Sequence, residues 1–449
     1  MSIITLVFIG QKRNFLTFIV LKTNFLNFLL QIDDVIIKLQ YMYKQRIITE
    51  RLKRLTHNFP VVVVSGARQV GKSTVLKHTF PDTKVIVFDP VNDVAGAKAD
   101  PDLFLDNNPA PLILDEIQYA PQLAAAIKRR VDTKKKNNMY ILTGSQQWSV
   151  MKNIAESLAG RAVFIDLGGF TLSEIAQQTD TKSWLEQWLE NPDEFIKNPL
   201  QRLKLNRTVY QQLWRGWLPK ADSLDEDLIQ TYYRSYMQTY LERDVRMIAD
   251  ISALDELGKF TQLASALTAQ EINYSKLGKD ISITPQTAKR WFNVLRATFQ
   301  WFEVPAYSGN TVKRISGKPK GYIADTGLAC MLNAISTPTA LGGHPITGAL
   351  FETAVAVEIR KLLAILPTAA MYHWRSHNTE VDLLLERDGK LFPIEIKLTT
   401  HPAKNDTGGI TSFRRTYPNC KIAPGIVIAP CTEFMKISEL EYALPWDTI

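Results

Sequence analysis

The stretch that decides the fold is Val61-Val62-Val63-Val64-Ser65-Gly66-Ala67-Arg68-Gln69-Val70-Gly71-Lys72-Ser73. Its four β-branched valines predict a buried strand, and the residues from Gly66 follow the spacing G-x-x-x-x-G-K-S. Glycines let the backbone N–H groups of such a loop curl around phosphate oxygens, and the helix that follows adds its positive N-terminal end. Lys72 is expected to reach the β- and γ-phosphates of ATP, and the Ser73 hydroxyl to hold Mg²⁺. The stretch therefore predicts a phosphate-binding loop between a strand and a helix.

A second apolar strand, Pro111-Leu-Ile-Leu-Asp-Glu116, ends in two acids. Asp115 is placed to support the Mg²⁺ shell, and Glu116 at the strand tip is a candidate general base for the attacking water. The presence of both acids favours hydrolysis over binding alone.

A third strand, Met139–Ser145, ends in hydroxyl groups, and Thr143 or Ser145 either senses the γ-phosphate or forms a polar turn. Arg161 is either a group that stabilises transition-state charge, in its own subunit or a neighbouring one, or a surface ion pair. The expected nucleotide contacts are Gly66, Ala67, Arg68, Gln69, Val70, Gly71, Lys72, Ser73, Thr74 and Thr143.

Helical patterns dominate residues 171–258. The aromatic residues of this segment recur at helical spacing and are expected in the core; they include Trp184, Trp188, Trp214 and Trp217. The charged run Tyr240–Arg246 is expected to be a solvated face.

Residues 259–304 predict a helix-turn-helix, with a first helix at Leu263–Ala269 and a second from Ser275. Thr284 is the expected N-cap of the third helix and Pro285 its first residue. One face of that helix is an apolar stripe of Ala288, Phe292, Leu295 and Phe299. The other face has side chains suited to a DNA major groove, namely Gln286, Lys289, Arg290 and Asn293. Lys313–Lys320 would then be a wing; the alternative is a small module that packs against protein.

A hairpin is predicted at Asp388-Gly389, between the alternating runs 380–387 and 390–398. Pairing outward from this turn places Arg387 opposite Lys390 and Asp382 opposite Glu395. Two facing carboxylates repel each other, and a divalent cation would resolve the conflict.

Glu352 is a third acid, on the apolar face of the helical pattern 348–363, where a carboxylate needs a partner or a metal. Oxygen ligands from Glu352, Asp382 and Glu395 suit Mg²⁺ or Mn²⁺, and Lys397 could orient water or neutralise developing charge. The alternative is a buried salt bridge between Glu395 and Lys397, with Asp382 solvated.

The composition of the 449 residues excludes a disordered chain, since 45% are hydrophobic and 22% charged. Three cysteines are too few for a disulfide framework, which favours a cytoplasmic location. A net charge of +8 permits nucleic-acid binding. Residues 1–41 contain no apolar stretch long enough for a membrane span; either Met42 is the true start, or this segment associates with a membrane surface.

These motifs resemble the bacterial and archaeal AAA-family ATPases that carry a C-terminal winged-helix and restriction-endonuclease-like region. The ATPase part of the resemblance rests on the phosphate loop and on the segments Leu112–Glu116, Thr143–Ser145 and Leu158–Arg161. Its remainder rests on Tyr240–Arg246, Tyr322–Leu328 and Glu380–Lys397. The last of these has the PD-(D/E)xK nuclease pattern, with Asp382, Glu395 and Lys397 in motif order and Glu352 on the preceding helix.

The resemblance implies an α/β fold in which a P-loop NTPase parallel sheet with a helical lid precedes a winged helix-turn-helix and a restriction-endonuclease-like α/β domain. The expected boundaries are an extension at 1–41, the ATPase core at 42–170, the lid or linker at 171–258, the winged-helix-like module at 259–333 and the nuclease-like domain at 334–449. The expected function is Mg²⁺-dependent ATP hydrolysis whose nucleotide state controls a DNA-binding, nuclease-like region, with a homo-oligomer as a candidate assembly. The alternative is an ATP-gated switch with an inactive nuclease-like scaffold for protein or DNA partners.

Overall fold

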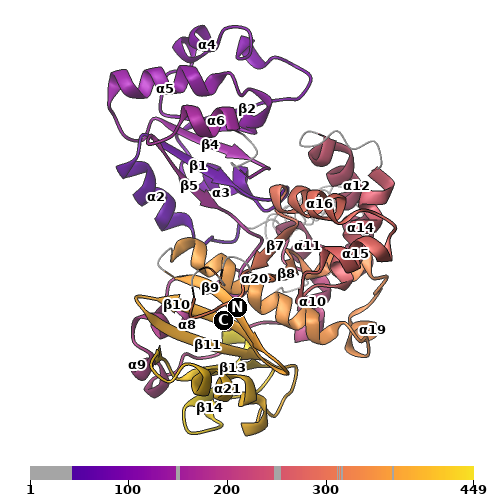
Figure 1. The fold of residues 1–449 in the computed structure, drawn as a ribbon. Coiled ribbons are helices and arrows are strands. Elements are labelled where there is room, and N and C mark those ends of the chain that lie inside the picture. Colours follow the sequence, from indigo (N-terminus) through magenta and orange to yellow (C-terminus); the bar gives the residue numbers. More distant parts are fainter. Residues whose placement is uncertain are drawn as a thin grey trace, which may run out of the picture. The chain divides into compact units, whose positions relative to one another are not determined.

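A five-stranded parallel sheet organises the first part of the chain in the computed structural model, which describes residues 43–147, 152–246, 254–310, 312, 314, 317–366 and 369–448. The expected extension at 1–41 and the candidate start Met42 lie outside the described residues. The strands are β1 (Val61–Ser65), β2 (Lys84–Val87), β3 (Leu112–Asp115), β4 (Tyr140–Gly144) and β5 (Ala162–Asp166), in the order β2-β3-β4-β1-β5. This is the α/β sheet with a strand–loop–helix unit that the valine run predicts (Figure 1).

Alternating residues of β1 pack on opposite faces of this sheet. Val62 and Val64 join the core that contains α2 (Thr49–Asn58) and α3 (Lys72–Thr79). Val61 and Val63 pack with α4 (Pro101–Asn107) and α5 (Leu123–Lys134). Burial on both faces explains why this strand is a continuous run of valines rather than an alternating pattern.

Helices follow the sheet, as the sequence predicts: α6 (Lys152–Ser157) before β5, then α7 (Leu172–Ile175), α8 (Trp184–Glu190), α9 (Pro192–Lys197), α10 (Val209–Arg215), α11 (Pro219–Ser223), α12 (Glu226–Thr239) and the π-helix η3 (Tyr240–Val245). All four tryptophans of the segment are at most 2% exposed, which confirms them as core. α8 and α9 pack on the C-terminal sheet, where the Trp188 ring lies 5.3 Å from that of Phe392. The expectation of a solvated face at Tyr240–Arg246 is wrong at Asp244, which is 3% exposed.

The next module has three helices and a small antiparallel sheet. Its elements are α14 (Leu254–Ala266), β6 (Gln270–Glu271), α15 (Tyr274–Asp280), α16 (Pro285–Ala297), β7 (Trp301–Val304) and β8 (Lys320–Ile323), with the strand order β6-β8-β7. Thr284 caps α16 by accepting a hydrogen bond from the Thr287 N–H. The predicted apolar stripe is buried, but its last residue, Phe299, lies beyond the helix end at Ala297 and has a φ of 61°. The first helix differs from the expected Leu263–Ala269: it ends at Ala266, and Ala269 has a left-handed φ of 61° that no helix continues through.

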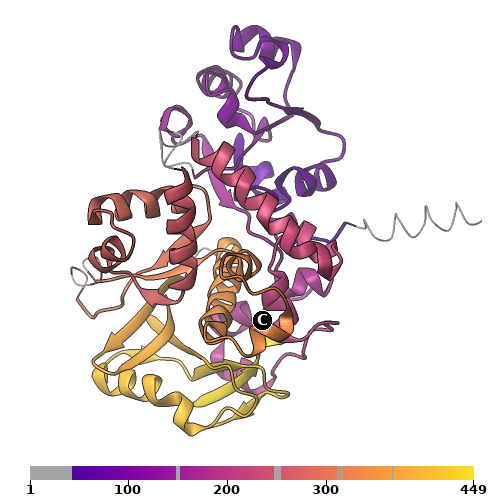
Figure 2. The same ribbon diagram turned by 90° about the vertical axis from the view of Figure 1, so that its right-hand side faces the viewer.

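A seven-stranded mixed sheet forms the C-terminal part. After α18 (Thr326–Leu332), α19 (Pro338–Gly342) and α20 (Thr347–Ile365) come β9 (Ala370–Ser376), β10 (Thr379–Arg387), β11 (Lys390–Ile396), α21 (Gly408–Thr416), β12 (Lys421–Ile422), β13 (Gly425–Ala429), β14 (Met435–Lys436) and β15 (Glu441–Pro445). Short 3₁₀ turns lie at Val94–Gly96, Ile117–Tyr119, Lys404–Thr407 and Trp446–Thr448. α20 lies beside the C-terminal sheet (Figures 1 and 2). Its apolar side chains share a core with those of β10 and β11.

The Asp388-Gly389 hairpin is confirmed. Both turn residues have positive φ, 51° and 72°, as a two-residue type I′ turn requires. Arg387 pairs with Lys390, and the predicted register holds out to Leu383 opposite Ile394. The strand pairing ends there, and the next residues outward, Asp382 and Glu395, both contact the Lys397 ammonium, at 3.4 Å and 2.9 Å.

Candidate functional site

The phosphate loop leaves the carboxyl end of β1 and closes on itself. Gly71 has φ 94° and caps α3, so the turn needs a residue that tolerates left-handed backbone. At Gly66 a Cβ atom would lie 2.1 Å from the backbone oxygen of Leu167, so a side chain is excluded there. Lys72 is 5% exposed, and its ammonium donates to the backbone oxygens of Gly66 and Ala67, both at 2.9 Å. Burial lowers the pKa of Lys72, and this buried cation is preorganised for an anionic ligand.

Asp115 joins the loop to the neighbouring strands. The Ser73 hydroxyl donates to Asp115 Oδ2 at 2.6 Å, and the Thr143 hydroxyl donates to Asp115 Oδ1. Thr143 also accepts the backbone N–H of Glu116 at 3.1 Å. Thr143, a sequence candidate for γ-phosphate sensing, therefore holds the Asp115 carboxylate and the backbone of Glu116, while Ser145 accepts a hydrogen bond from Gln118.

Glu116 stands at the tip of β3 in left-handed backbone, φ 59° and ψ 47°. A non-glycine residue held in this region is uncommon and is concentrated at functional sites. Its carboxylate accepts a hydrogen bond from the Gln118 side-chain amide. The structure thus places the acid beyond the strand end, next to the Asp115–Ser73 pair.

The donor set fits Mg²⁺. Magnesium prefers hard oxygen ligands and is held through few protein groups plus substrate phosphates. Ser73 and Asp115 supply a hydroxyl and a carboxylate already within hydrogen-bond distance of each other.

Arg161 lies away from this loop. It directly precedes β5, and the parallel register places Ala162 beside Val61, at the amino end of β1. Its guanidinium instead pairs with Asp132. The expectation that Arg161 acts on phosphate in its own subunit is therefore wrong, because the loop lies at the carboxyl ends of the strands and Arg161 at their amino ends. Action on a neighbouring subunit stays a prediction.

Two contacts that the sequence analysis missed hold the loop from outside. Arg68, expected to contact nucleotide, makes a bidentate pair with Asp244 of η3, at 3.0 Å from Nε and 2.7 Å from Nη2. The adjacent Gln69 accepts the Tyr232 hydroxyl proton at 2.6 Å. The sequence shows Asp244 only as part of a charged run, which does not reveal its partner; the π-helical turn that carries it, a feature common at functional sites, is visible only in the folded chain.

Arg46 is a further residue that holds the loop and that the sequence did not indicate. It is 4% exposed and donates to the backbone oxygens of Val70 and Gly168, both at 2.8 Å, and it pairs with Glu174 at 3.0 Å. It thereby ties the phosphate loop to the segment that follows β5. No local pattern marks this arginine.

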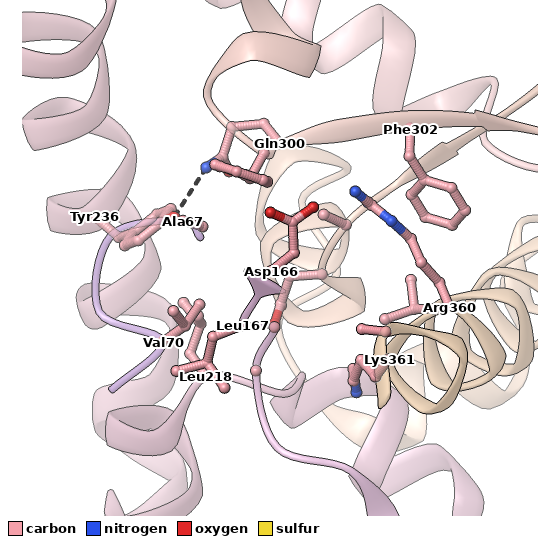
Figure 3. Close-up of a pocket in the computed structure, with 17 residues that line it drawn as sticks. Ala67, Val70, Asp166, Leu167, Leu218, Tyr236, Gln300, Phe302, Arg360 and Lys361 are labelled. Carbon is pink, nitrogen blue, oxygen red and sulfur yellow. Dashed lines mark hydrogen bonds between the residues drawn. The ribbon is translucent and has the colours of Figure 1, made fainter. Parts of the chain in front are cut away.

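A cavity of about 290 Å³ lies beside the loop, between Ala67 and Val70 on one side and α20 on the other (Figure 3). α20 is fastened there through two bonds: Glu358 accepts the backbone N–H of Leu172 at 2.9 Å, and the Lys361 ammonium donates to the backbone oxygen of Phe170 at 2.5 Å. Figure 3 shows Asp166, at the end of β5, and Arg360 of α20 facing this cavity. The same helix carries Glu352, one of the acids predicted to bind metal.

The C-terminal acids come together, but lysines neutralise them. Lys397 lies 2.9 Å from Glu395 and 3.4 Å from Asp382. Lys320, from β8, lies 2.6 Å from Glu352 and 3.6 Å from Asp382. The acids are nearly buried, and the described residues contain no group of three or more acids, histidines or cysteines arranged to hold a metal ion.

This corrects three expectations. Glu352, Asp382 and Glu395 do not form the expected metal-ligand triad, because an ammonium group stands between Glu352 and Asp382. In the alternative, the Glu395–Lys397 salt bridge is confirmed, although Lys397 is 34% exposed and so only the Glu395 side of the pair is buried; Asp382 is 3% exposed rather than solvated. The expected wing is also wrong at two positions: Lys320 is buried in this cluster, and Arg314 pairs with Glu386 of β10 at 2.8 Å.

Burial shifts the protonation of this cluster. It raises the pKa of Glu352 to about 7, with a further contribution from Asp382. Burial and Asp382 also raise the pKa of Glu395, whereas Lys320 and Lys397 outweigh burial and lower the pKa of Asp382. Asp382 is thus the acid that stays ionised, between the two ammonium groups.

Comparisons with known proteins agree with a nucleotide site at the phosphate loop. Residues 58–176 match a family described as an AAA domain, and residues 206–339 and 347–449 match two domains of unknown function, DUF8612 and DUF4143. The chain is 27% identical over 412 residues to the uncharacterized proteins Mb2031c of Mycobacterium bovis and Rv2008c of Mycobacterium tuberculosis, covering 91% of this chain and 85% of each relative.

Solved structures are more distant. The Walker-type ATPase PABY2304 of Pyrococcus abyssi aligns at 13% identity and a TM-score of 0.37, covering 65% of this chain and 96% of that one. AMPPCP-bound DnaA of Aquifex aeolicus aligns at 11% identity and a TM-score of 0.22, covering 56% and 86%. Within the described residues, no helix combines the length and apolar character of a membrane span. The family match and the loop geometry together support a nucleotide-binding, AAA-type ATPase domain at residues 58–176.

Proposed function

We propose that this protein binds ATP at the Gly66–Ser73 loop and hydrolyses it to ADP and phosphate. The observation that carries the proposal is the 2.6 Å hydrogen bond between Ser73 and Asp115, beside a buried Lys72 and a strained Glu116. Backbone N–H groups of the loop and the start of α3 bind the phosphates. The Lys72 ammonium exchanges its two backbone acceptors for phosphate oxygens.

Ser73 and Asp115 are the residues that would hold Mg²⁺, which neutralises phosphate charge when it is bound. Glu116 accepts a proton from the attacking water. Thr143 keeps Glu116 and Asp115 in register by bonding both. Arg68 keeps its ion pair with Asp244 and lies close enough to Glu116 to interact with its charge. Arg68 therefore adds positive charge near the reacting phosphate.

The test is steady-state ATP hydrolysis with Mg²⁺ by wild-type protein and by Lys72→Ala. We expect Lys72→Ala to lose at least a hundredfold in kcat/KM, since the ammonium is the loop's own phosphate ligand. Lys77→Ala removes an exposed lysine from the same helix and serves as the matched control, with unchanged hydrolysis. Equal rates for wild type and Lys72→Ala would refute the proposal.

Nucleotide state is proposed to reach the rest of the chain through two connections. One runs from Arg68 to Asp244 and the end of α12. The other runs from the segment after β5, through Glu358 and Lys361, along α20 to Glu352. Both connections begin at or beside the phosphate loop. A movement of the loop on phosphate binding would therefore alter the contacts along both of them.

DNA binding by the 254–323 module, in a winged-helix-like arrangement, is a second candidate function. It is favoured by the exposed polar and basic face of α16, which presents Gln286, Lys289, Arg290 and Asn293. Arg290→Ala is expected to weaken duplex binding, with affinity falling steeply as salt rises because phosphate contacts dominate. Absent or salt-insensitive binding would assign the module to packing against protein. Assembly as a homo-oligomer and a cytoplasmic location complete the proposal.

The C-terminal region has two candidate roles. One is nuclease activity that depends on Mg²⁺ or Mn²⁺, and the other is an inactive nuclease-like scaffold. The lysine contacts of Glu352, Asp382 and Glu395 favour the scaffold. Incubation of plasmid DNA with Mg²⁺ or Mn²⁺ separates them: cleavage that Asp382→Ala abolishes would establish the nuclease.

A further inference from the structure

Lys320 is the group that sets the chemistry of the C-terminal cluster. It is a 4% exposed lysine at the first position of β8, and its ammonium lies 2.6 Å from Glu352 Oε1 and 3.6 Å from Asp382 Oδ1. The Tyr322 hydroxyl, two residues along the same strand, donates to the same Glu352 oxygen at 2.7 Å. One carboxylate oxygen of Glu352 is therefore shared by an ammonium and a phenol from one strand.

The backbone that carries Lys320 is fixed on several sides. β8 pairs with β6 through Lys320 opposite Glu271, and with β7 through Lys320 opposite Val304. Just before the strand, the backbone oxygen of Lys318 lies 3.0 Å from Nε2 of His373, in β9. Burial lowers the pKa of His373 to about 4, so this ring is neutral and donates. Lys320 consequently reaches the cluster from a strand that is itself bonded to the C-terminal sheet.

The other carboxylate oxygens of the cluster also have partners within the chain. Asp382 Oδ2 accepts the backbone N–H of Ile396 at 2.8 Å and the Lys397 ammonium at 3.4 Å. Glu395 Oε2 accepts Lys397 at 2.9 Å, and its Oε1 faces Gly409, where a Cβ atom would lie only 2.1 Å away. Two ammonium groups and a glycine at the start of α21 thus surround three acids.

We propose that the ammonium of Lys320 takes the place expected for a divalent cation between Glu352 and Asp382, and that the cluster is a metal-independent junction between the 254–323 module and the C-terminal sheet. A cation at this position would contact Glu352 and Asp382 from where Lys320 now stands, and the fixed lysine both blocks and repels it. A carboxylate pair that a chain-borne ammonium neutralises needs no metal to be stable. This inference is independent of ATP hydrolysis, which uses other residues.

The experiment is a nucleotide-free titration of the full chain with Mn²⁺, in which electron paramagnetic resonance measures the Mn²⁺ that remains free. Four proteins are compared: wild type, Asp382→Asn, Lys320→Met and the double variant Lys320→Met/Asp382→Asn. We expect wild type and Asp382→Asn to bind the same amount of Mn²⁺. Lys320→Met should gain about one Mn²⁺ per chain, and the double variant should lose that gain.

Lys320→Arg is the matched control, since it keeps a positive charge at the cluster and should gain no site. The melting temperature of Lys320→Met should also rise on Mn²⁺ addition, while that of wild type should not, because only the variant has a cation site to fill. Mn²⁺ bound by wild type and lost in Asp382→Asn overturns the proposal, as does a folded Lys320→Met with no gain. If Lys320→Met does not fold, the comparison of wild type with Asp382→Asn still decides. ATP hydrolysis, measured on the same samples, distinguishes failure here from failure of the proposed function.

Discussion

Replacing Asp244 by alanine should loosen α12 and η3 from the phosphate loop. Asp244 is 4% exposed at its side chain and Arg68 17%, and two charge-assisted hydrogen bonds join them across 176 residues of sequence. Removing one partner of a fully buried pair costs about 3–5 kcal/mol. Because Arg68 keeps some access to water, we expect a smaller cost of about 2 kcal/mol for the local opening of this contact.

Hydrogen exchange is the suitable assay, since a chain of several packed parts need not unfold in one step. A cost of about 2 kcal/mol corresponds to about 30-fold faster exchange of the amides in α12 and η3. Glu242→Ala removes an exposed carboxylate from the same π-helix and should change exchange by less than about threefold.

The double variant Arg68→Met/Asp244→Ala tests whether the pair is the cause. If it is, Arg68→Met adds little to Asp244→Ala, because the interaction is already lost. Equal exchange in Asp244→Ala and Glu242→Ala, or fully additive effects of Arg68→Met and Asp244→Ala, would refute the reasoning.

Two further predictions follow from single contacts. Burial lowers the pKa of His373 to about 4, so the ring stays neutral in the folded state, whereas the unfolded chain takes up a proton below about pH 6.5. The contribution of His373 to folding stability is therefore complete above about pH 6.5. It is lost as the pH falls toward 4, by up to about 3 kcal/mol. Urea unfolding at pH 7.5 and pH 5 should therefore show a smaller acid loss in His373→Gln than in wild type, and an equal loss in both proteins would contradict the assignment. Gly66→Ala would bring a Cβ within 2.1 Å of the Leu167 backbone oxygen and should abolish ATP binding in a filter or calorimetric assay. The control is Gly96→Ala, at a glycine that also has positive φ but where no atom lies within 4 Å of the added Cβ. Retained ATP binding in Gly66→Ala would contradict the close approach.

The parts of the fold that sequence predicted are those in which local pattern and structure coincide. The valine run of β1, the loop spacing, the Thr284 cap and the Asp388-Gly389 turn each act within a few residues. The turn also fixes the register as far as Leu383 opposite Ile394, and Asp382 and Glu395, just beyond the last paired residues, both reach the same lysine, Lys397.

The parts that sequence did not predict depend on partners distant in the chain. Asp244 is a charged residue in a helical run, and only the folded chain shows that Arg68 lies opposite it. Lys320 is part of a basic stretch that resembles a solvated wing until β8 pairs and carries it into the cluster. Arg161 directly precedes β5, and the parallel pairing of β5 with β1 places it at the end of the strands away from the loop. Charge at one position does not encode which segment of the chain will face it.

The most direct measurement of the central claim separates ATP binding from hydrolysis in Glu116→Gln. This substitution keeps the side-chain shape and the hydrogen-bonding capacity beside Gln118 but removes the base. We predict that Glu116→Gln binds ATP with an affinity within about threefold of wild type, while single-turnover hydrolysis slows by about 10²- to 10⁴-fold. Hydrolysis at the wild-type rate in Glu116→Gln, or the absence of ATP binding by the wild-type protein, would contradict the account.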